Sequence, residues 1–149
     1  MPPVTSLMRE AIRKVTGQEA LVVNVDMNIG LEVLMDNPSS VGTDLIVGAV
    51  AGINRYPVPL ILIDMGTATT ICVVSENKQY IGGMILPGIG VSMNSLTSRT
   101  AQRPRISLGP PKRLIGKNSV ECMQSGALYG NASCIDGMVD RIEEELGQK

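Results

Sequence analysis

The stretch "LILIDMGTATTICVV" (residues 60–74) joins two apolar runs through a short bend that contains a carboxylate, a glycine and threonines. Both runs are rich in Ile, Leu and Val, which is typical of strands. Backbone N–H groups beside a glycine, together with threonine hydroxyls, form a natural cradle for phosphate oxygens. A carboxylate such as Asp64 at a strand end can hold a cation. The spacing alone fits a phosphate cradle and a plain threonine-rich turn equally well.

A third apolar segment, "QYIGGMILPG" (79–88), follows after the short connection "ENK". Together the three segments predict a three-strand meander. Gly82 and Gly83 allow either a bulge or the close approach of a ligand, and Pro87-Gly88 predicts a turn. Taken alone, a structural turn is the simpler interpretation of these glycines.

Apolar residues at helical spacing surround this meander. They predict helices over 5–16, 43–56, 91–101, 119–130 and 133–146. The first helix is expected to begin at a Thr5/Ser6 cap and to stop at Gly17. Shorter apolar runs predict a buried strand over 20–25 and an exposed strand from residue 29 to the break at Asn37-Pro38. This order of elements predicts an α/β layer fold with the meander as its sheet nucleus.

The composition excludes several classes of function. The net charge of −1 gives no electrostatic reason to expect nucleic acid or an anionic membrane surface as a partner. No histidine occurs in the 149 residues, which excludes Ser-His-Asp and Cys-His catalysis within this chain. The three cysteines fit no metal-ligand spacing, so a reducing compartment is expected. With neither a membrane-spanning run nor a signal-peptide core, the predicted location is the cytoplasm.

Two predicted helix starts carry polar groups that suit either capping or chemistry. Asp44, in "GTDL" (42–45), fits an ordinary capping position, and it also fits the proton acceptor that a hydroxyl-phosphorylating enzyme needs. The stretch "GKNS" (116–119) lies at another helix start, which favours an anionic group. Asn118 and Glu121 have the spacing of a capping box, so capping is the simpler explanation there.

Five segments in order resemble the type III pantothenate kinases: "VGTDLIVGAVAG", "LILIDMGTATTICVV", "YIGGMILPG", "SLTSRTAQRPRI" and "LIGKNSVECMQSGALYG". That family belongs to the actin-like ATPase-domain superfamily, so the resemblance implies an actin-like, ribonuclease H-like α/β fold. It also implies transfer of phosphate from ATP to pantothenate, giving 4′-phosphopantothenate, the first step of coenzyme A synthesis. The same resemblance implies that the protein uses ATP with Mg²⁺, requires a monovalent cation (K⁺ or NH₄⁺) and forms a homodimer.

The resemblance also implies roles for individual residues. It places the proton acceptor at Asp44. Contacts with pantothenate are implied at Gly42, Thr43, Asp44, Leu45 and Ser119. ATP contacts are implied at Gly66 and Thr67, the cation ligand at Asp64, and a glycine turn beside the site at Gly82, Gly83 and Gly88. On this interpretation, the bend quoted first holds a cation and phosphate oxygens between two strands.

The chain departs from the family pattern in two ways. Leu45 stands where the family has an Arg, and Leu offers no charged partner to a substrate carboxylate. The family's opening Asp-x-Gly-Asn-Thr motif and its later Gly-rich adenosine segment are not found. We therefore expect a fragment incomplete at both termini, with 1–55 ending a first actin-like domain and 56–149 forming a second without its last strands. Such a fragment is expected to be weakly active or inactive.

Two alternatives remain open at this stage. One is different chemistry on the same fold, as in a sugar kinase or phosphatase of the superfamily. The other is a non-catalytic paralogue or regulatory accessory protein that dimerises with an intact kinase.

Overall fold

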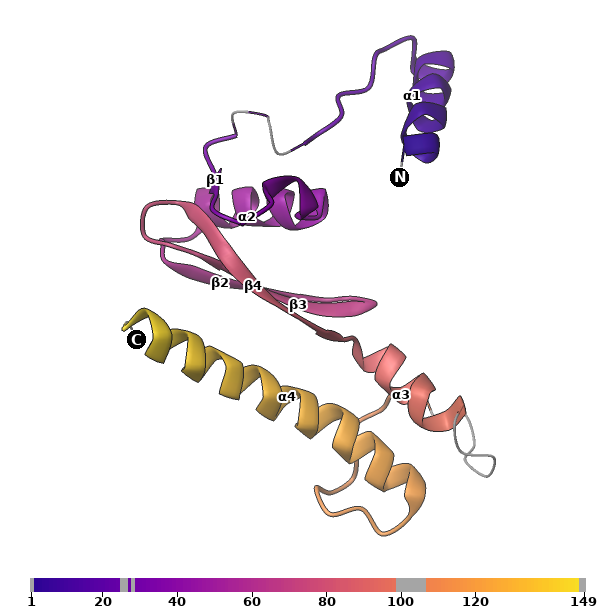
Figure 1. The fold of residues 1–149 in the computed structure, drawn as a ribbon. Helices are drawn as coiled ribbons and strands as arrows, with labels where there is room; N and C mark the ends of the chain where they lie inside the picture. Colours follow the sequence, from indigo (N-terminus) through magenta and orange to yellow (C-terminus); the bar gives the residue numbers. More distant parts are fainter. Residues whose placement is uncertain (1, 25–26, 28, 99–106, 148–149) are drawn as a thin grey trace.

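The computed structural model describes residues 2–24, 27, 29–98 and 107–147, and these residues form one four-stranded sheet with helices on both faces (Figure 1). The elements in chain order are α1 (Pro2–Thr16), β1 (Glu32–Val33), the 3₁₀ turn η1 (Pro38–Ser40), α2 (Thr43–Arg55), β2 (Leu60–Met65), β3 (Ala68–Val74), β4 (Gln79–Pro87), α3 (Ile89–Ser98) and α4 (Ser119–Leu146). The sheet order is β1-β4-β3-β2. The predicted mixed α/β class is confirmed.

The predicted three-strand meander is also confirmed. β2 and β3 pair antiparallel from Leu60 opposite Val74 to Met65 opposite Thr69. β3 and β4 pair antiparallel as well, with a register irregularity between Val73 and Val74. β1 adds two residues in parallel to the far side of β4, and β2 forms the opposite edge of the sheet.

Side chains alternate along each strand, so the two faces of the sheet carry different cores. On one face, Cys72 and Val74 of β3 pack with Ile46 and Ala49 of α2, and Tyr80 completes this cluster. On the other face, a second cluster joins β3 to the C-terminal half of α4. Its buried members are Ile71, Val73 and Ile142. Figure 1 shows α2 and α4 on opposite sides of the sheet.

The prediction of two C-terminal helices is wrong, because α4 runs unbroken over 28 residues. Gly130 takes an ordinary helical conformation, and the side-chain amide of Asn131 donates to the carbonyl of Ala127, so neither residue interrupts the backbone ladder. The helix ends at Gly147, whose φ of 64° is the left-handed conformation common after a helix.

The first helix is confirmed, but its predicted cap is wrong. α1 begins at Pro2, where the fixed φ of proline suits a first turn, so Thr5 and Ser6 lie inside the helix. Gly17 follows its end with φ 70° and donates its N–H to the carbonyl of Arg13 at 2.9 Å. The third predicted helix is confirmed as α3 up to Ser98, and its last predicted residues lie outside the described ones.

The predicted buried strand over 20–25 is wrong as far as the structure describes it. Residues 20–24 form no strand, and Leu21 is 77% exposed because no neighbouring strand lies against it. Val25 lies outside the described residues. The predicted exposed strand from residue 29 shortens to Glu32–Val33, the two residues in register with β4, and the N–H of Leu34 adds a bond to the carbonyl of Tyr80 at 2.9 Å.

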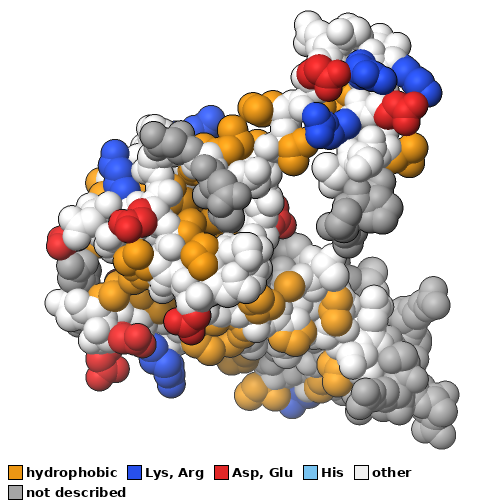
Figure 2. Space-filling view, turned by 45° about the horizontal axis from the view of Figure 1, so that its top comes forward, with side chains coloured by type: hydrophobic (Ala, Val, Ile, Leu, Met, Phe, Trp, Pro, Cys, Tyr) orange, Lys and Arg blue, Asp and Glu red, His pale blue; other side chains and the backbone are white. Residues whose placement is uncertain are grey.

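Charges of both signs are scattered over the face of the molecule seen in Figure 2, in keeping with the small net charge. Within the described residues, no helix has the length and hydropathy that a bilayer crossing requires.

Candidate functional site

A cavity of about 230 Å³ lies where the start of α2 meets β3 and β4. Three of the predicted site residues line it: Gly42, Leu45 and Gly83. Thr70 lines it too, and we call it the Thr70 cavity. Two larger hollows border β2, of about 640 Å³ against α4 and about 470 Å³ against α2, but no predicted site residue lines either. The Thr70 cavity is therefore the candidate site.

Asp44 lies in the first turn of α2, between Gly42 and Leu45, which line this cavity, but it is not itself among the lining residues. Its Oδ1 accepts the backbone N–H of Leu45 at 3.0 Å. The N-cap residue is Gly42, which has no side chain to cap the helix. A Cβ placed on Gly42 would lie only 2.5 Å from Asp44 Oδ1, so the glycine leaves room for the carboxylate beside the cavity wall. Thr43 is exposed next to them.

Asp64 and Thr70 face each other across β2 and β3. Both belong to the face of the sheet that α2 covers, since Leu62 and Cys72, two residues away, pack in the α2 core. Directly opposed residues have Cβ atoms about 5 Å apart. The exposed Asp64 carboxylate therefore lies beside the residue that gives the cavity its name.

The hydroxyls of Thr69 and Thr70 are buried and have no hydrogen-bond partner among the described residues. Buried hydroxyls in proteins are nearly always paired, and leaving one unpaired costs about 1–3 kcal/mol. The two threonines point to opposite faces of β3, so only Thr70 lines the cavity. Its unpaired hydroxyl oxygen is fully buried, so it lies behind the cavity wall and is not open to the cavity itself.

The Gly66-Thr67 bend is held against Gly88 rather than against the cavity. The N–H of Gly88 donates to the carbonyl of Thr67 at 3.0 Å. A Cβ on Gly88 would lie 2.2 Å from the carbonyl oxygen of Gly66 and 2.5 Å from that of Thr67. Gly88 therefore permits the bend to rest on the start of α3, and these three residues form a second group of predicted site residues.

The glycines of β4 have structural roles of their own. A Cβ on Gly83 would lie 2.1 Å from the carbonyl oxygen of Ile71, so only glycine fits between the strands there. Gly82 has φ 135°, a conformation that favours glycine, next to the register irregularity. Of the two alternatives predicted for this pair, the bulge is present as the register irregularity, while the close approach of a ligand stays a prediction.

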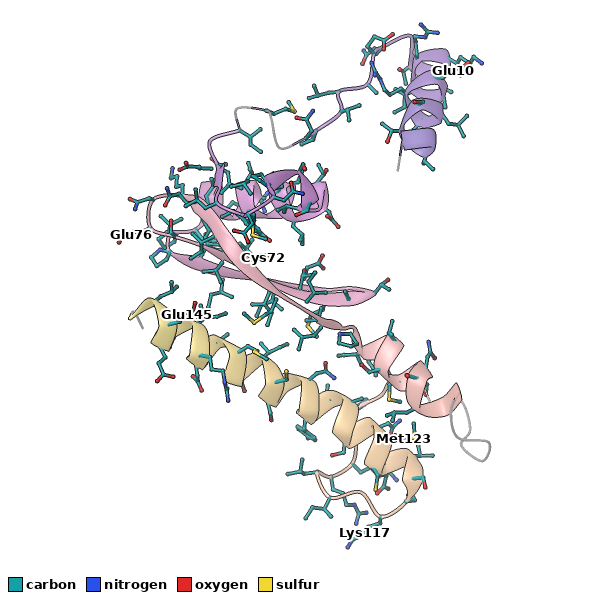
Figure 3. All side chains as sticks on the ribbon, viewed as in Figure 1. Glu10, Cys72, Glu76, Lys117, Met123 and Glu145 are labelled. Carbon is teal, nitrogen blue, oxygen red and sulfur yellow. The ribbon has the colours of Figure 1, made fainter. Side chains whose placement is uncertain are left out.

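Ser119 lines none of the three cavities described above. It is the exposed first residue of α4, after the N-cap Asn118, whose side-chain oxygen accepts the N–H of Glu121 at 2.9 Å. The predicted cap is thus confirmed. The Glu121 carboxylate accepts the backbone N–H of Lys117, and this bond lowers the pKa of the carboxyl group. Figure 3 shows Lys117 at the end of α4 that lies far from Cys72.

Sequence reasoning gave no role to Ser40 or Tyr80 and counted Thr70 only among the threonines of the bend, yet all three line the cavity. Strand alternation would have placed Thr70 on the same face as Cys72. Nothing in the sequence predicts which residues of the loop before α2 reach β4. The Tyr80 hydroxyl donates to Cys72 Sγ at 3.2 Å, and burial raises the pKa of this phenol above its ordinary value.

The oxygen donors suit a hard cation better than a transition metal. Asp64 supplies a carboxylate oxygen beside the Thr70 hydroxyl, and hard cations take oxygen ligands. The described residues contain no cluster of three or more His, Cys, Asp or Glu side chains that could hold a metal ion.

Comparison with known proteins assigns the chain to a family. Residues 1–141 match the family model described as type III pantothenate kinase. A type III pantothenate kinase of Exiguobacterium sp. (strain ATCC BAA-1283 / AT1b) is 43% identical over 148 residues, which cover 99% of this chain and 58% of the relative. The chain therefore spans somewhat more than half the length of this relative. With nearly all of its length matched, the chain belongs to the type III pantothenate kinase family.

Proposed function

We propose that the protein carrying this chain transfers the γ-phosphate of ATP to pantothenate and forms 4′-phosphopantothenate, the first product of coenzyme A synthesis. The family membership over 1–141 supports the reaction. The observation that carries the proposal is the position of Asp44, an exposed carboxylate at the head of α2 between two residues, Gly42 and Leu45, that line a cavity against the sheet.

In this proposal Asp44 is the proton acceptor. The substrate hydroxyl oxygen bonds to the γ-phosphorus, the bond from that phosphorus to the ADP oxygen breaks, and the hydroxyl proton passes to Asp44. One Asp44 oxygen accepts the N–H of Leu45, which fixes the carboxylate and leaves its other oxygen for the substrate. Within the described residues no ion pair involves Asp44. Phosphoryl transfer of this kind depends mainly on positioning and electrostatics.

The other site residues are proposed to contact substrate, nucleotide and cation. Pantothenate contacts are proposed for Gly42, Thr43, Leu45 and, from the start of α4, Ser119. The Gly66-Thr67 bend would hold ATP phosphates, and Asp64 would hold K⁺ or NH₄⁺. When bound, Mg²⁺ and this monovalent cation supply positive charge that offsets the charge of the phosphates.

The remaining assignments stay proposals. We propose a cytoplasmic homodimer, and a division into actin-like domains at residue 55. This boundary would divide residues that share one core, because Ile46, which precedes it, and Val74, which follows it, both pack in the core under α2. Since the chain spans 58% of its relative, we propose that it is weakly active or inactive by itself, because phosphoryl transfer needs all of its positioning groups.

The test is an assay of the protein at its full encoded length with pantothenate, MgATP and K⁺. Asp44→Asn removes the proton acceptor and keeps the size of the side chain, so kcat should fall by about 10²–10⁴. Asp140→Asn makes the same change on the exposed face of α4 and should leave kcat unaltered. Full activity in the Asp44→Asn variant would contradict the assigned role, and no turnover of pantothenate by the unaltered protein would contradict the function.

The same assay addresses the non-catalytic alternative. The 149-residue chain would be mixed with an intact kinase of the family. A change in the intact enzyme's activity, together with none from the chain itself, would favour an accessory role.

A further inference from the structure

We propose that α4 pairs antiparallel with α4 of a second copy of the protein, through the face of the helix that lies opposite the sheet. This inference rests on the homodimer of the proposed function and names the surface that forms it. We call this surface the outer face of α4. Its residues recur at a spacing of three or four and so share one side of the helix: Cys122, Gly126, Gly130, Ser133 and Gly137.

The outer face lies opposite the side of α4 that packs on the sheet. Met138 and Ile142 belong to the cluster that joins β3 to α4. With 3.6 residues per turn, Gly126 and Ile142 point in nearly opposite directions. All residues of the outer face except Gly137 are exposed, and a Cβ built on Gly126 or Gly130 would meet nothing within 4 Å. A second helix can therefore approach this face closely, to an interaxial distance of about 8 Å.

The middle of α4 lacks the charges that a solvent-facing helix surface carries. Residues 122–135 contain no Asp, Glu, Lys or Arg on any side of the helix. This part of the helix is nevertheless open, since Leu128 and Tyr129 are 40% and 42% exposed. A surface helix generally presents charged residues on the side away from its core. Depletion of charge with an accessible tyrosine is instead typical of the centre of a protein interface.

The charges of α4 are concentrated at its two ends and have opposite signs. The loop before the helix carries Lys112, Arg113 and Lys117. The last turns of the helix carry one cation, Arg141, and the acids Asp136, Asp140, Glu143, Glu144 and Glu145. Figure 3 shows Lys117 and Glu145 at opposite ends of α4.

This distribution is unfavourable within a single helix. The helix dipole favours negative charge at the N-terminus and positive charge at the C-terminus, and the last turn of α4 contains no basic residue. Within the described residues, no ion pair involves any of the acids from Asp136 to Glu145. The acidic end of α4 is therefore left without a cationic partner by the described part of the chain.

An antiparallel second copy supplies that partner. With a two-fold axis next to Gly130, Lys117 of each copy lies beside the partner's Glu144, because the two residues are almost equally far from Gly130 along the chain. The basic end is held against the helix, since Ser125 Oγ donates to the carbonyl of Leu114 at 2.5 Å. Exposed ion pairs add little affinity. The charges therefore set the direction of the pair, and the small residues allow its close packing.

The outer face fits a copy of itself better than another segment of the protein. A two-fold interface brings the same patch of both copies together. One helix with a basic end, an uncharged middle and an acidic end is complementary to itself when the second helix runs in the opposite direction. A segment from elsewhere in the protein would need the same pattern in reverse.

The first test is sedimentation equilibrium of the protein at its full encoded length. Gly130→Leu places a large side chain at the centre of the outer face, where it meets nothing in its own chain, so the dimer Kd should rise about tenfold or more. Gly48→Leu is the matched control. It makes the same change at an exposed glycine of α2, on the other side of the sheet, and should leave the Kd unaltered. Equal effects of the two variants would overturn the inference.

A charge swap tests the antiparallel direction. Lys117→Glu and Glu144→Lys should each raise the dimer Kd about three- to tenfold at low salt, because each places like charges together. The double variant restores opposite charges in both pairs and should return the Kd to within about twofold of the original. Effects that simply add in the double variant would overturn the antiparallel pairing.

The remaining outcomes separate the inference from the function on which it rests. A full-length protein that stays monomeric would overturn the inference, and the kinase assay of the same sample would decide the proposed reaction independently. Loss of stability in Gly130→Leu at a concentration where the protein is monomeric would show that another part of the protein covers the outer face, which would also overturn the inference.

Discussion

Helices α1 and α2 have similar lengths and similar patterns, yet only one of them is packed. In α1 the apolar residues Val4, Leu7, Met8, Ile12 and Val15 repeat at helical spacing, and all are more than a third exposed. In α2 the corresponding stripe, from Ile46 to Ile53, is buried against the sheet. Figure 1 shows α1 standing apart from the sheet and α2 lying along it.

The difference teaches that a periodic apolar stripe specifies a helix but does not specify what covers it. α2 is joined to β2 by only a few residues and carries Gly52 where it meets the strand, so close packing follows from the chain itself. A Cβ on Gly52 would lie 3.0 Å from a methyl group of Leu62. α1 is separated from β1 by a long irregular segment, and the described part of that segment contains no helix or strand.

The largest expected effect is the difference in stability between shortening a buried side chain of α2 and an exposed side chain of α1. Ile46 is fully buried and Leu7 is 66% exposed. Ile46→Ala should lower the free energy of unfolding by about 2–5 kcal/mol, because it leaves a cavity under α2. Leu7→Ala should change it by less than ~0.5 kcal/mol. Urea titrations followed by circular dichroism measure both. Equal losses would mean that the stripe of α1 is covered in solution.

A pair of glycines within α2 sharpens the comparison. Gly52→Ala should lower the free energy of unfolding by about 1–3 kcal/mol, because the new methyl group meets Leu62 and Leu60. Gly48→Ala meets nothing within 4 Å and should raise it by about 0.5–1 kcal/mol through better helix propensity. Opposite signs in the same urea titration are the expected result. A gain from both substitutions would mean that α2 does not lie this close to β2.

The sequence predicted those parts of the fold that depend on local pattern. The meander, α2 and the cap at Asn118 follow from alternation, periodicity and capping chemistry in neighbouring residues. The strand over 20–25 and the division of α4 were wrong, because burial and helix continuity depend on contacts distant in sequence. A strand-like run needs a neighbouring strand, and Gly130 ends a helix only if it leaves the helical conformation.

The candidate site was predictable only in part for the same reason. Asp44, Asp64 and the glycines stood out by residue type. That Gly83 fits against Ile71 and that Thr70 reaches the cavity depend on strand register, which no short motif encodes. That Lys117 lies at the end of α4 far from Cys72 depends on how the helix crosses the sheet (Figure 3).

A smaller expected effect concerns how the free energy of unfolding depends on pH, to which the core under α2 contributes and α1 does not. The core under α2 holds the Tyr80 phenol, whose pKa is raised by burial, whereas the charged residues of α1 are exposed. Above pH ~10 the Tyr80 phenol loses its proton in the unfolded chain but keeps it in the folded chain, so the free energy of unfolding falls as the pH rises. Below pH ~10 this phenol keeps its proton in both states and has no effect on the pH dependence of the free energy of unfolding. Tyr80→Phe should cost about 1 kcal/mol at pH 7 and should flatten this alkaline decline. An unchanged decline in the variant would assign it to other groups.

The smallest expected effect concerns the ion pairs of α1. Arg9 and Arg13 each approach the carboxylate of Glu19 at 3.9 Å, and all three side chains are largely exposed. Glu19→Gln should therefore change the free energy of unfolding by less than ~0.5 kcal/mol. A loss above 1 kcal/mol would show that α1 contributes to the stability of the whole chain.

The short connections of the meander set an order for assembly. Two residues join β2 to β3, whereas Glu32 of β1 meets Gln79 of β4 across 47 positions of sequence. Closing short loops costs less chain entropy, and proteins with local contacts fold faster. We therefore expect the hairpins in the transition state for folding, with α2 and η1 docking after it. A ligand that joins α2 to β3 should then slow unfolding and leave the folding rate unchanged.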